Sequence, residues 1–368
     1  MTEQRPRVIL HAFSSFSLGG AQARFVQLAN AFGRRYRHVI VAMDGNFEAG
    51  KRLYPDIDWK ALPVPVVRGS GLANRSAFRA VLKAHTPDLV ATYNWGAIEW
   101  VAANLPRLAP HLHVEDGFGP DEVQRQLRRR AWARRVLLGW TGTLVVVASR
   151  NLERIAHDVW HLPSRRVRFI ANAVAPPASG SAASPVRGAP GSTLTIGTVA
   201  GLRPEKNLSR LIRSFAFVNA RHAARLVIVG DGPERSKLEM LARELGVASA
   251  VEFVGYQPNP MDWLRTFDLF ALSSDTEQLP ISMLEAMSCG VPVVATRVGD
   301  VADVMPRVAA LALAEPQDAS FEATLLKVVE RRAEWAAWVE AGYAQLRLHY
   351  VPEHMFSQWR RIFDGELA

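Results

Sequence analysis

The sequence predicts an α/β protein with two doubly wound domains, each built on a parallel sheet that helices cover on both faces. Short apolar runs alternate with longer amphipathic segments in both halves of the chain, as strands and helices do in such sheets. At 368 residues the chain is too long for one ordinary hydrophobic core. A stretch rich in Pro, Gly, Ala and Ser, APPASGSAASPVRGAPGS (175–192), separates the halves and is typical of a linker.

The domain boundaries follow from these patterns. We expect an N-terminal domain over 1–178, a linker over 179–192, a C-terminal domain over 193–350 and a last helix, 351–368, that packs back on the N-terminal domain. Open parallel sheets bind ligands at the carboxyl ends of their strands. We therefore expect the two domains to face each other across a cleft that holds the ligand.

In the first half, strands are expected at VILHAF (8–13), HVIVAM (38–43), DLVATY (88–93), HLHVED (111–116) and TLVVVAS (143–149). FVQLANAF has helical spacing after the first strand, and DEVQRQLRRRAWARRVLLGW (121–140) is also expected to be a helix. In that second helix, a buried face can combine Val123, Leu127, Ala131, Leu138 and Trp132 or Val136.

In the second half, strands are expected at TLTIGTVA (193–200), RLVIVGDG (225–232), AVEFVGY (250–256), LFALSS (269–274) and VPVVAT (291–296). Helices should begin near Pro204 and Pro233, and most of the last 50 residues should be helical.

Composition narrows the class of protein. Hydrophobic residues make up 49% of the chain and charged residues 21%, which is typical of a folded protein. The single cysteine, Cys289, excludes an intrachain disulfide framework and a cysteine-rich zinc site. MTEQRPRVILHAF lacks the pattern of a signal peptide, and no run reaches about 18 apolar residues, so we expect a cytoplasmic protein.

Positive charge is concentrated in the first half. Residues 1–180 contain 25 Lys/Arg against 13 Asp/Glu, whereas residues 181–368 contain 19 against 22. The segment 121–140 alone carries six arginines, together with Trp132 and Trp140. It is either a solvated helix packed on the domain or a docking surface for an anionic membrane. Nucleic acid is not expected as a partner, because no nucleic-acid-binding motif accompanies the charge.

The first candidate site is GLRPEKN (201–207), which follows a strand and opens a helix. Arg203 and Lys206 lie near that helix start, where backbone N–H groups lack partners, and two cations there suit a diphosphate. The alternative is an ordinary surface helix with solvated charges.

The second candidate site is EQLPISMLEAMSCGVPVVAT (277–296), at the end of another strand. Glu277 precedes the expected helix and Glu285 lies about one turn inside it. A carboxylate can accept hydrogen bonds from two neighbouring hydroxyls, as on a ribose. The alternative is that Glu277 caps the helix and Glu285 is a half-buried structural acid.

Taken in order, GLRPEKN, VGDGP (229–233), FVGY (253–256) and the E-x7-E run ending in CGVPVVAT resemble the C-terminal half of family 4 glycosyltransferases. These are retaining, nucleotide-sugar-dependent enzymes of the GT-B fold. The resemblance is strong over about 193–305 and looser in the first half. It implies that the C-terminal domain is a Rossmann-like, nucleotide-sugar-binding domain and that the N-terminal one is on the acceptor side.

The resemblance also implies roles for matching residues. Arg203 and Lys206 would bind the donor diphosphate, Glu285 the ribose and Glu277 a hydroxyl of the transferred sugar. Further donor contacts would come from Leu279, Pro280, Ile281, Gly255 and Tyr256. Pro280 stands where many relatives have glycine and has no N–H to donate.

In the first half, the resemblance covers SLGGAQARF and HLHVEDGFG. Gly19 and Gly20 would let the backbone approach the phosphate or sugar, with φ > 0 accessible to them. Gln22 stands where relatives often have Glu. His113 would face the cleft as a catalytic residue that hydrogen-bonds the donor sugar, although a strand histidine can also be purely structural.

The predicted function is that of a retaining, metal-independent hexosyltransferase. It would move a sugar from a UDP- or GDP-sugar co-substrate, without another cofactor, to a glycan or lipid-linked acceptor. Polysaccharide, lipopolysaccharide or glycolipid assembly at the inner face of the cell membrane is the expected setting. The alternative is a catalytically inactive GT-B module that binds a nucleotide sugar; an epimerase of the same fold is disfavoured by the Arg203, Lys206, Glu277 and Glu285 set.

Overall fold

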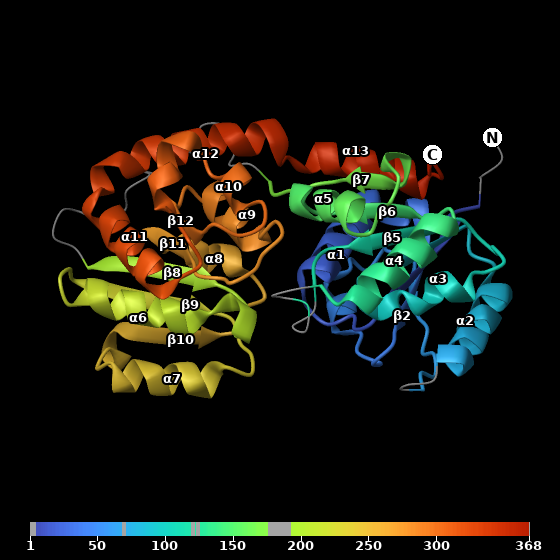
Figure 1. Ribbon diagram of the computed structural model, residues 1–368, viewed down its shortest axis with the longest axis horizontal. Coiled ribbons are helices and arrows are strands. Elements are labelled where there is room, and N and C mark those ends of the chain that lie inside the picture. Colours follow the sequence, from blue (N-terminus) through green and yellow to red (C-terminus); the bar gives the residue numbers. More distant parts are fainter. Residues whose placement is uncertain (1–4, 68–70, 119–121, 123–125, 176–192, 368) are drawn as a thin grey trace. The chain divides into compact units, whose positions relative to one another are not determined.

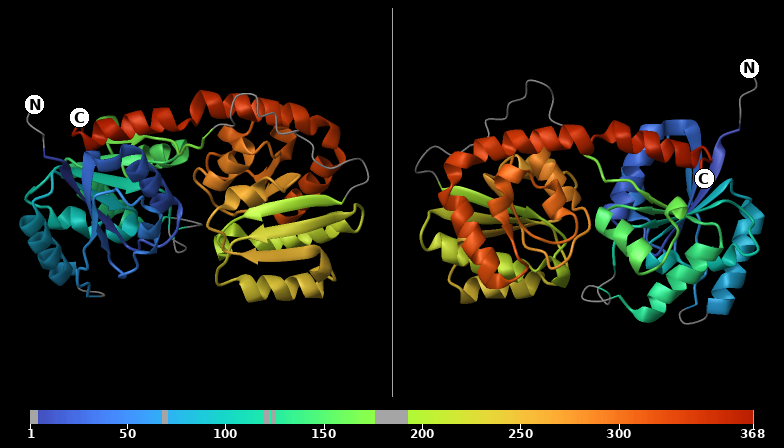
Figure 2. Two further views of the ribbon diagram at one scale, coloured as in Figure 1. Left: turned by 180° about the vertical axis from the view of Figure 1, so that it is seen from behind. Right: turned by 45° about the horizontal axis from the view of Figure 1, so that its top comes forward.

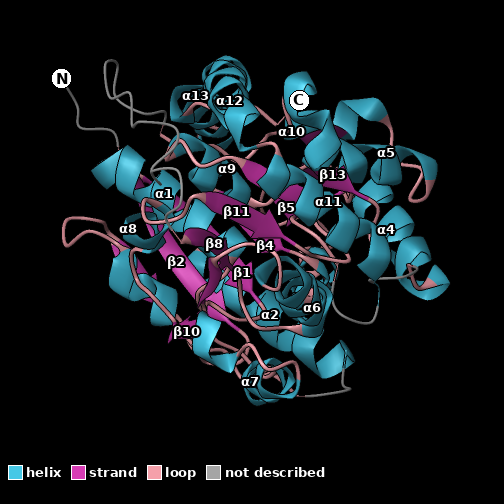
Figure 3. Ribbon diagram, turned by 90° about the vertical axis from the view of Figure 1, so that its left-hand side faces the viewer, coloured by secondary structure: helices cyan, strands magenta, loops and turns pink. Residues whose placement is uncertain are grey.

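The structure is a computed structural model that describes residues 5–67, 71–118, 122, 126–175 and 193–367. The chain forms two compact units: Met1–Asn172 with Glu353–Ala368, and Ala173–Pro352. Each unit contains one parallel sheet with helices on both of its faces (Figures 1, 2 and 3). The predicted linker, 179–192, lies outside the described residues.

The first unit has a seven-stranded sheet in the order β3-β2-β1-β4-β5-β6-β7. Strands β1, β4, β5 and β6 are almost entirely buried, because helices cover both faces, and this explains their continuous apolar runs. The strands are β1 (Arg7–Phe13), β2 (Tyr36–Ala42), β3 (Trp59–Ala61), β4 (Leu89–Tyr93), β5 (His111–Glu115), β6 (Leu144–Val147) and β7 (Val167–Phe169).

Two groups of helices cover this sheet. One face carries α2 and α3, where the rings of Phe78 and Trp100 stack 4.3 Å apart. The other face carries α1 and α13, where Phe25 and Phe363 both contact the ring of His11. The helices are α1 (Gly20–Phe32), α2 (Gly71–His85), α3 (Glu99–Ala103), α4 (Arg128–Trp140), α5 (Arg150–Asp158) and α13 (Pro352–Phe363).

The last helix, α13, belongs to the first unit although it lies at the far end of the sequence (Figures 1 and 2). Trp359, Ile362 and Phe363 are buried, and the Phe363 ring packs edge-on against Phe32 and Tyr36. The first unit is therefore completed by a segment that follows the whole second unit in the chain.

The second unit has a six-stranded sheet in the order β10-β9-β8-β11-β12-β13. Its strands are β8 (Leu194–Val199), β9 (Ala224–Val229), β10 (Val251–Gly255), β11 (Leu269–Leu272), β12 (Val293–Thr296) and β13 (Leu313–Ala314). Its helices are α6 (Leu208–Asn219), α7 (Arg235–Glu244), α8 (Pro260–Leu264), α9 (Ile281–Ser288), α10 (Val301–Val304), α11 (Asp318–Glu330) and α12 (Trp335–His349).

The predicted fold class is confirmed, since both units are doubly wound α/β structures. Strands β3, β7 and β13 were not predicted, because two or three residues are too few to show a period. Two helix starts differ from the prediction. The basic helix begins at Arg128, not near 121, and residues 204–206 form a short 3-10 turn that ends at Asn207, whose φ is 41°. The long helix α6 begins only at Leu208, where the Asn207 side chain accepts from the Arg210 N–H.

Candidate active site

Lys206 and Glu277 meet at the carboxyl end of the second sheet. The Lys206 Nζ donates to Glu277 Oε1 at 2.6 Å, and the Ser274 hydroxyl donates to the same oxygen at 2.7 Å. The side chains of Lys206 and Glu277 are 18% and 9% exposed. These residues are 71 positions apart but follow the neighbouring strands β8 and β11, so their loops emerge at the same edge. The structure thus places two of the predicted site residues in direct contact.

The loop after β11 is held against the turn that carries Lys206. The Ser273 hydroxyl donates to the carbonyls of Lys206 and Asn207, and the Asp275 N–H donates to the Glu205 carbonyl at 2.9 Å. Arg210, which is buried, donates to the Ser273 carbonyl at 2.9 Å. Sequence reasoning missed this support. Arg210 lies three residues beyond the GLRPEKN stretch, and nothing local distinguishes it from a surface arginine.

Arg203 is more open than Lys206. Its side chain is 58% exposed, and its Nε lies 3.1 Å from Glu205 Oε1. Together with Lys237 and Asp275 it lines a polar pocket beside the start of α6. An exposed guanidinium with two remaining N–H donor groups can grip a phosphate, so the position suits the predicted role. Lys237 was not predicted as a site residue.

Three glycines allow the loops at this edge to pack closely. A Cβ on Gly230 would lie 1.9 Å from the Ala200 carbonyl oxygen, and one on Gly232 would lie 2.5 Å from that of Leu202. Gly299, with φ 53°, faces the Glu277 carbonyl oxygen, which would lie 2.2 Å from a Cβ. Any side chain at Gly299 would therefore displace the backbone that positions Glu277.

Helix α9 begins directly after this loop. Pro280 is its N-terminal capping residue, with extended backbone, and both Leu279 and Pro280 are buried. Ile281 opens the helix, and Glu285 follows within it, half-buried. The first turn of a helix directs N–H groups toward its start, so the segment is suited to meet an anion without a donor from Pro280.

Gly255 and Tyr256 lie at the end of β10, on the same edge of the sheet. Gly255 has φ 81°, and its carbonyl accepts from the Gly230 N–H at 2.9 Å. Tyr256 is 47% exposed, so its ring is accessible to a flat ligand such as a base.

In the first unit, Gly19 and Gly20 lie where α1 begins after β1. Gly19 has an extended backbone with φ −164°, and neither glycine has positive φ, so the positive φ that glycine permits is not used here. A Cβ on Gly20 would meet nothing within 4 Å, so this position is open. Gln22 donates to the Ser15 carbonyl at 2.8 Å and so acts within the loop.

His113 is buried within the first sheet, whereas the prediction placed it facing the cleft. The side chain is 0% exposed in the middle of β5, where its Nδ1 bonds with the Thr92 hydroxyl at 2.9 Å. Its Nε2 lies 3.5 Å from Glu115 Oε2. Alternation correctly predicted that His113 and Glu115 share a face of the strand, but that face lies under helices. The histidine is part of the core.

The buried polar chain continues from Glu115 into α4. Arg134 is fully buried, donates through Nε to Glu115 at 3.1 Å, and bonds through its other nitrogens to Glu122. Burial alone would raise the pKa of Glu115, but Arg134 and His113 beside it hold that pKa below its usual value. Trp95 and Trp160 both contact the Arg134 guanidinium within about 5 Å, as cation–π pairs do.

Helix α4 buries part of the predicted face, since Leu138 is buried and Ala131 is partly buried, but the burial of Arg134 was not predicted. Leu138 and Arg134 point inward, whereas Trp132 is 66% exposed and Trp140 is 86% exposed. Of the two alternatives predicted for this face, Trp132 and Val136, only Val136 is partly buried. Of the predicted helical residues, 121 and 123–125 lie outside the described part of the chain.

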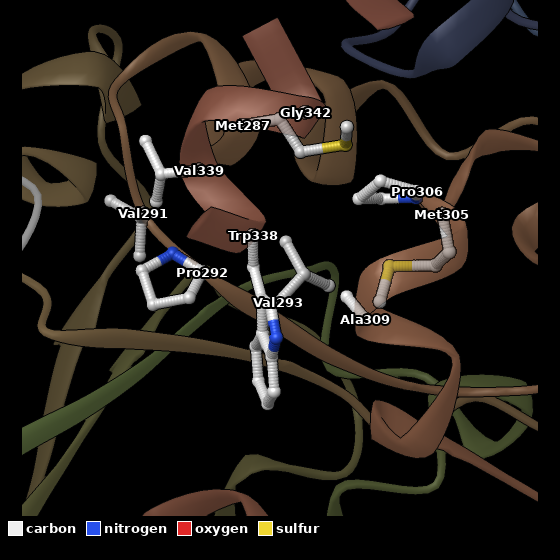
Figure 4. A pocket seen from close by; sticks show the side chains of 10 residues that line it. All are labelled: Met287, Val291, Pro292, Val293, Met305, Pro306, Ala309, Trp338, Val339 and Gly342. Carbon is white, nitrogen blue, oxygen red and sulfur yellow. The ribbon is translucent and has the colours of Figure 1, made fainter. Parts of the chain in front are cut away.

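An apolar pocket lies elsewhere in the second unit, among α9, β12 and α12 (Figure 4). Met287, Val293, Met305 and Trp338 are among the side chains around it, and none of the ten lining residues is charged. It offers nothing to a diphosphate, and we interpret it as a packing gap under α12. Among the described residues, no His, Cys, Asp and Glu side chains cluster as a metal site, and none of the described helices has the length and apolarity to span a membrane.

The sequence is similar to those of several known proteins. The chain is 28% identical to the putative glycosyltransferase EpsF of Bacillus subtilis over 312 residues, 77% of each chain. It is 36% identical to N-acetyl-alpha-D-glucosaminyl L-malate synthase of Bacillus anthracis over 107 residues, 29% of this chain and 28% of the relative. It is 29% identical to the lipopolysaccharide core biosynthesis glycosyltransferase LpsD of Rhizobium meliloti, over 44% of this chain and 47% of the relative.

Solved structures share the fold at low sequence identity. Anabaena Alr3699/HepE, in complex with UDP and glucose, has a TM-score of 0.79 at 18% identity, covering 98% of this chain and 100% of that one. WaaG, described as a glycosyltransferase involved in lipopolysaccharide biosynthesis, has a TM-score of 0.74 at 18% identity, covering 97% and 100%.

Family models match both halves. The model for glycosyltransferase family 4 matches residues 18–176, and the model for glycosyl transferases group 1 matches residues 182–345. The group 1 match contains the Lys206–Glu277 site, and the family 4 match contains strands β2 to β7 of the first sheet. With both halves matched and the fold shared, the chain belongs to the family 4-type glycosyltransferases of the GT-B fold.

Proposed function

We propose that the protein transfers a sugar from a nucleoside-diphosphate sugar to an acceptor hydroxyl, with retention of configuration and without a metal ion. The acceptor is a glycan or a lipid-linked glycan in the assembly of a cell-surface polysaccharide, lipopolysaccharide or glycolipid. LpsD and WaaG, named for lipopolysaccharide biosynthesis, support this acceptor class. HepE, whose structure holds UDP-glucose, supports a nucleotide-sugar donor.

The observation that carries the proposal is the contact of Lys206 with Glu277. An ammonium has three N–H donors, and one is used by Glu277 Oε1, so the others are available for a diphosphate oxygen. Glu277 likewise has a second oxygen that can accept from a sugar hydroxyl. A cation that can bind the leaving diphosphate and a carboxylate that can bind the sugar thus lie side by side. Breaking the bond between the diphosphate and the sugar requires both groups at one place.

The chemistry follows from where charge develops. Negative charge grows on the leaving diphosphate while positive charge grows on the sugar, and fixed charges stabilise both changes. Lys206 and the more exposed Arg203 supply positive potential at the phosphate. Because two cations and a helix start serve the leaving group, we propose that the reaction proceeds without a metal. Activity that survives EDTA would agree with this, and activity restored only by Mg²⁺ or Mn²⁺ would contradict it.

The direct test is donor turnover. UDP-glucose, UDP-N-acetylglucosamine, UDP-galactose and GDP-mannose are each incubated with the protein, and release of the nucleoside diphosphate is measured. Glu277→Gln should slow release by about 10²-fold, as loss of one transition-state contact does, with nucleoside-diphosphate binding retained. A protein that binds one donor but never releases the sugar would instead be the inactive GT-B module.

We also propose that α4 docks the protein on the inner face of the cell membrane. Arg128, Arg129 and Arg135 are exposed, as are Trp132 and Trp140, and the helix contains no acid. Exposed arginines attract anionic headgroups, and tryptophan rings settle at the interface. This orientation would bring a lipid-linked acceptor to the enzyme.

A further inference from the structure

Arg210 is a buried arginine that joins three segments of the second unit. It lies in the first turn of α6, and its side chain is 5% exposed. Its Nη1 donates to the Ser273 carbonyl and its Nη2 to the Pro316 carbonyl, both at 2.9 Å. Asp275 Oδ1 lies 2.8 Å from its Nη2, and Asp318 Oδ1 accepts from its Nε at 3.0 Å. A planar guanidinium with acceptors in fixed directions holds these segments in one arrangement.

Two of these acceptors belong to the loop that follows β11, which also carries Glu277. Arg210 contacts this loop at Ser273 and at Asp275, on either side of Ser274. The Ser274 hydroxyl donates to Glu277 Oε1 at 2.7 Å, so a shift of this backbone would move a donor that fixes the carboxylate. Arg210 therefore holds the two residues that flank the direct partner of Glu277.

The orientation of the Glu277 carboxylate depends on donors to one of its oxygens. Lys206 Nζ and the Ser274 hydroxyl both donate to Oε1, at 2.6 and 2.7 Å. Their positions therefore set the direction of the second oxygen, Oε2. Misplacing a group that contacts the reacting atoms by about 1 Å can cost about 10²-fold in rate, so small movements of this loop matter.

The turn that carries Lys206 has hydrogen bonds of its own. The Lys206 N–H donates to the Arg203 carbonyl, and the Asn207 N–H donates to the Pro204 carbonyl, both at 3.0 Å. The Arg210 side chain takes no part in these two bonds. Loss of that side chain should therefore disturb Glu277 more than Lys206.

A purely structural ion pair is the competing explanation, and Arg134 shows what such a residue looks like. It lies between Glu115 and Glu122, whose side chains are 0% exposed, so its removal would leave buried acids without a counter-charge. The two acids that pair with Arg210 are 40% and 54% exposed, so water can replace the guanidinium there. Buried charged groups add little stability over apolar residues of similar size, so stability alone is a weak reason for Arg210.

We infer that Arg210 is a positioning residue for the transfer reaction. It fixes the loop after β11, and through Ser274 it aims the Glu277 carboxylate at the hydroxyl of the transferred sugar. Arg210 itself does not contact the substrate. This inference rests on the proposed function, because it needs Glu277 to act on the sugar.

The test compares Arg210→Met, which keeps the length and removes every hydrogen bond, with Arg210→Lys, which keeps the charge but not the planar fork. The matched control is Arg213→Met. Arg213 lies on the same helix and its Nη1 is 3.6 Å from Asp318 Oδ2, but its side chain is 50% exposed. For each protein, kcat and KM for the donor that the wild type hydrolyses, Kd for its nucleoside diphosphate, and Tm are measured.

If Arg210 positions Glu277, Arg210→Met lowers kcat by about 10- to 100-fold, while Kd for the nucleoside diphosphate stays within about threefold. Arg210→Lys retains more of kcat than Arg210→Met, and Arg213→Met has the kcat of the wild type. If Arg210→Met does not fold, the same comparison is made with Arg210→Lys, whose kcat should fall by a measurable factor below that of the wild type.

A double variant separates positioning from support of the fold. In Arg210→Met/Glu277→Gln, the Arg210 change should lower kcat by less than about twofold beyond Glu277→Gln alone, because both changes act through one carboxylate. Losses that multiply, or a folded Arg210 variant with wild-type kcat, overturn the inference and leave the proposed function standing. A wild type that neither binds nor hydrolyses any of the four donors overturns both.

Discussion

The Lys206 Nζ and the Glu277 Oε1 lie 2.6 Å apart, although 71 residues separate them in the chain. The two side chains should contact different groups of one bound ligand. Lys206→Met should weaken binding of the nucleoside diphosphate by about 1.5–3 kcal/mol, the usual worth of a hydrogen bond to a charged group, whereas Glu277→Gln should leave it nearly unchanged. Titration calorimetry with UDP and GDP measures both. Arg331→Met, which breaks the exposed Arg331–Glu334 pair, is the matched control. Equal loss of affinity in the Lys206 and Arg331 variants would argue against a phosphate contact.

Gly299 should be sensitive to substitution because of the backbone that it faces. Gly299→Ala places a methyl group 2.2 Å from the Glu277 carbonyl oxygen, so the loop must move and donor binding should fall by at least tenfold. Gly246→Ala is the control: Gly246 also has positive φ, 70°, but open space around it. It should cost about 1–2 kcal/mol of stability through backbone strain alone and leave donor affinity intact. Thermal melts and calorimetry separate the two effects.

The stability of the first unit should fall on mild acidification. Burial lowers the pKa of His38 to about 4 and that of His111 to about 3, and burial with the nearby His38 lowers that of His11 well below its ordinary value. Between pH 6.5 and about 4 the unfolded chain binds protons that the folded chain excludes, so stability drops as pH falls. From pH 7.5 to 5.5 the loss should be about 1.4 kcal/mol per histidine, or about 4 kcal/mol for the three.

Denaturant titrations at pH 7.5 and 5.5 check this dependence. His38→Asn should reduce the difference between the two pH values by about one histidine's share, about 1.4 kcal/mol. The exposed His354, changed to Asn, should leave that difference unaltered. If the stability difference between pH 7.5 and 5.5 is the same in the His38 variant as in the wild type, a group other than His38 causes the pH dependence.

Membrane docking by α4 should depend on both charge and aromatic rings. Replacing Arg128, Arg129 and Arg135 with Gln should weaken binding to vesicles containing phosphatidylglycerol by about 3 kcal/mol, since each arginine near an anionic surface contributes about 1 kcal/mol. Trp132→Ala/Trp140→Ala should weaken it further, and neutral phosphatidylcholine vesicles should bind little of the wild type. Tyr54→Ala, at another exposed aromatic residue of the same unit, is the control in vesicle flotation. Binding that ignores these changes and salt would exclude the helix as the docking surface.

The sequence predicted those parts of the fold that depend on local pattern. The alternation of apolar runs and helical segments located β1, β2, β4, β5 and β6 in the first unit and β8 to β12 in the second. Local patterns indicated a diphosphate site at Lys206 and a hydroxyl contact at Glu277, and the resemblance assigned the two residues to one site. The stretch around Asn207 shows the limit of pattern: a left-handed residue splits what reads as one helix into a turn and α6.

The burial of the side chains in and after β5 could not be predicted from the sequence of that strand alone. His113 and Asp116 are three residues apart, and nothing in HLHVED indicates which of them is more exposed. His113 is buried beside Glu115, which pairs with Arg134 of α4, and Asp116 pairs with Arg24, which lies 92 residues earlier in the chain. Contacts at such separations are set by topology, which the local sequence does not show.

The return of α13 to the first unit has a consequence for how the protein is made. Phe363 packs beside Tyr36, and Asp364 accepts hydrogen bonds from Arg35 and Tyr36, so the last turn of the chain closes a surface formed by some of the earliest residues. During synthesis this surface stays uncovered until α13 has been made. The strands of the second unit all precede α13 in the chain, so that unit can complete its sheet before the first unit receives its last helix.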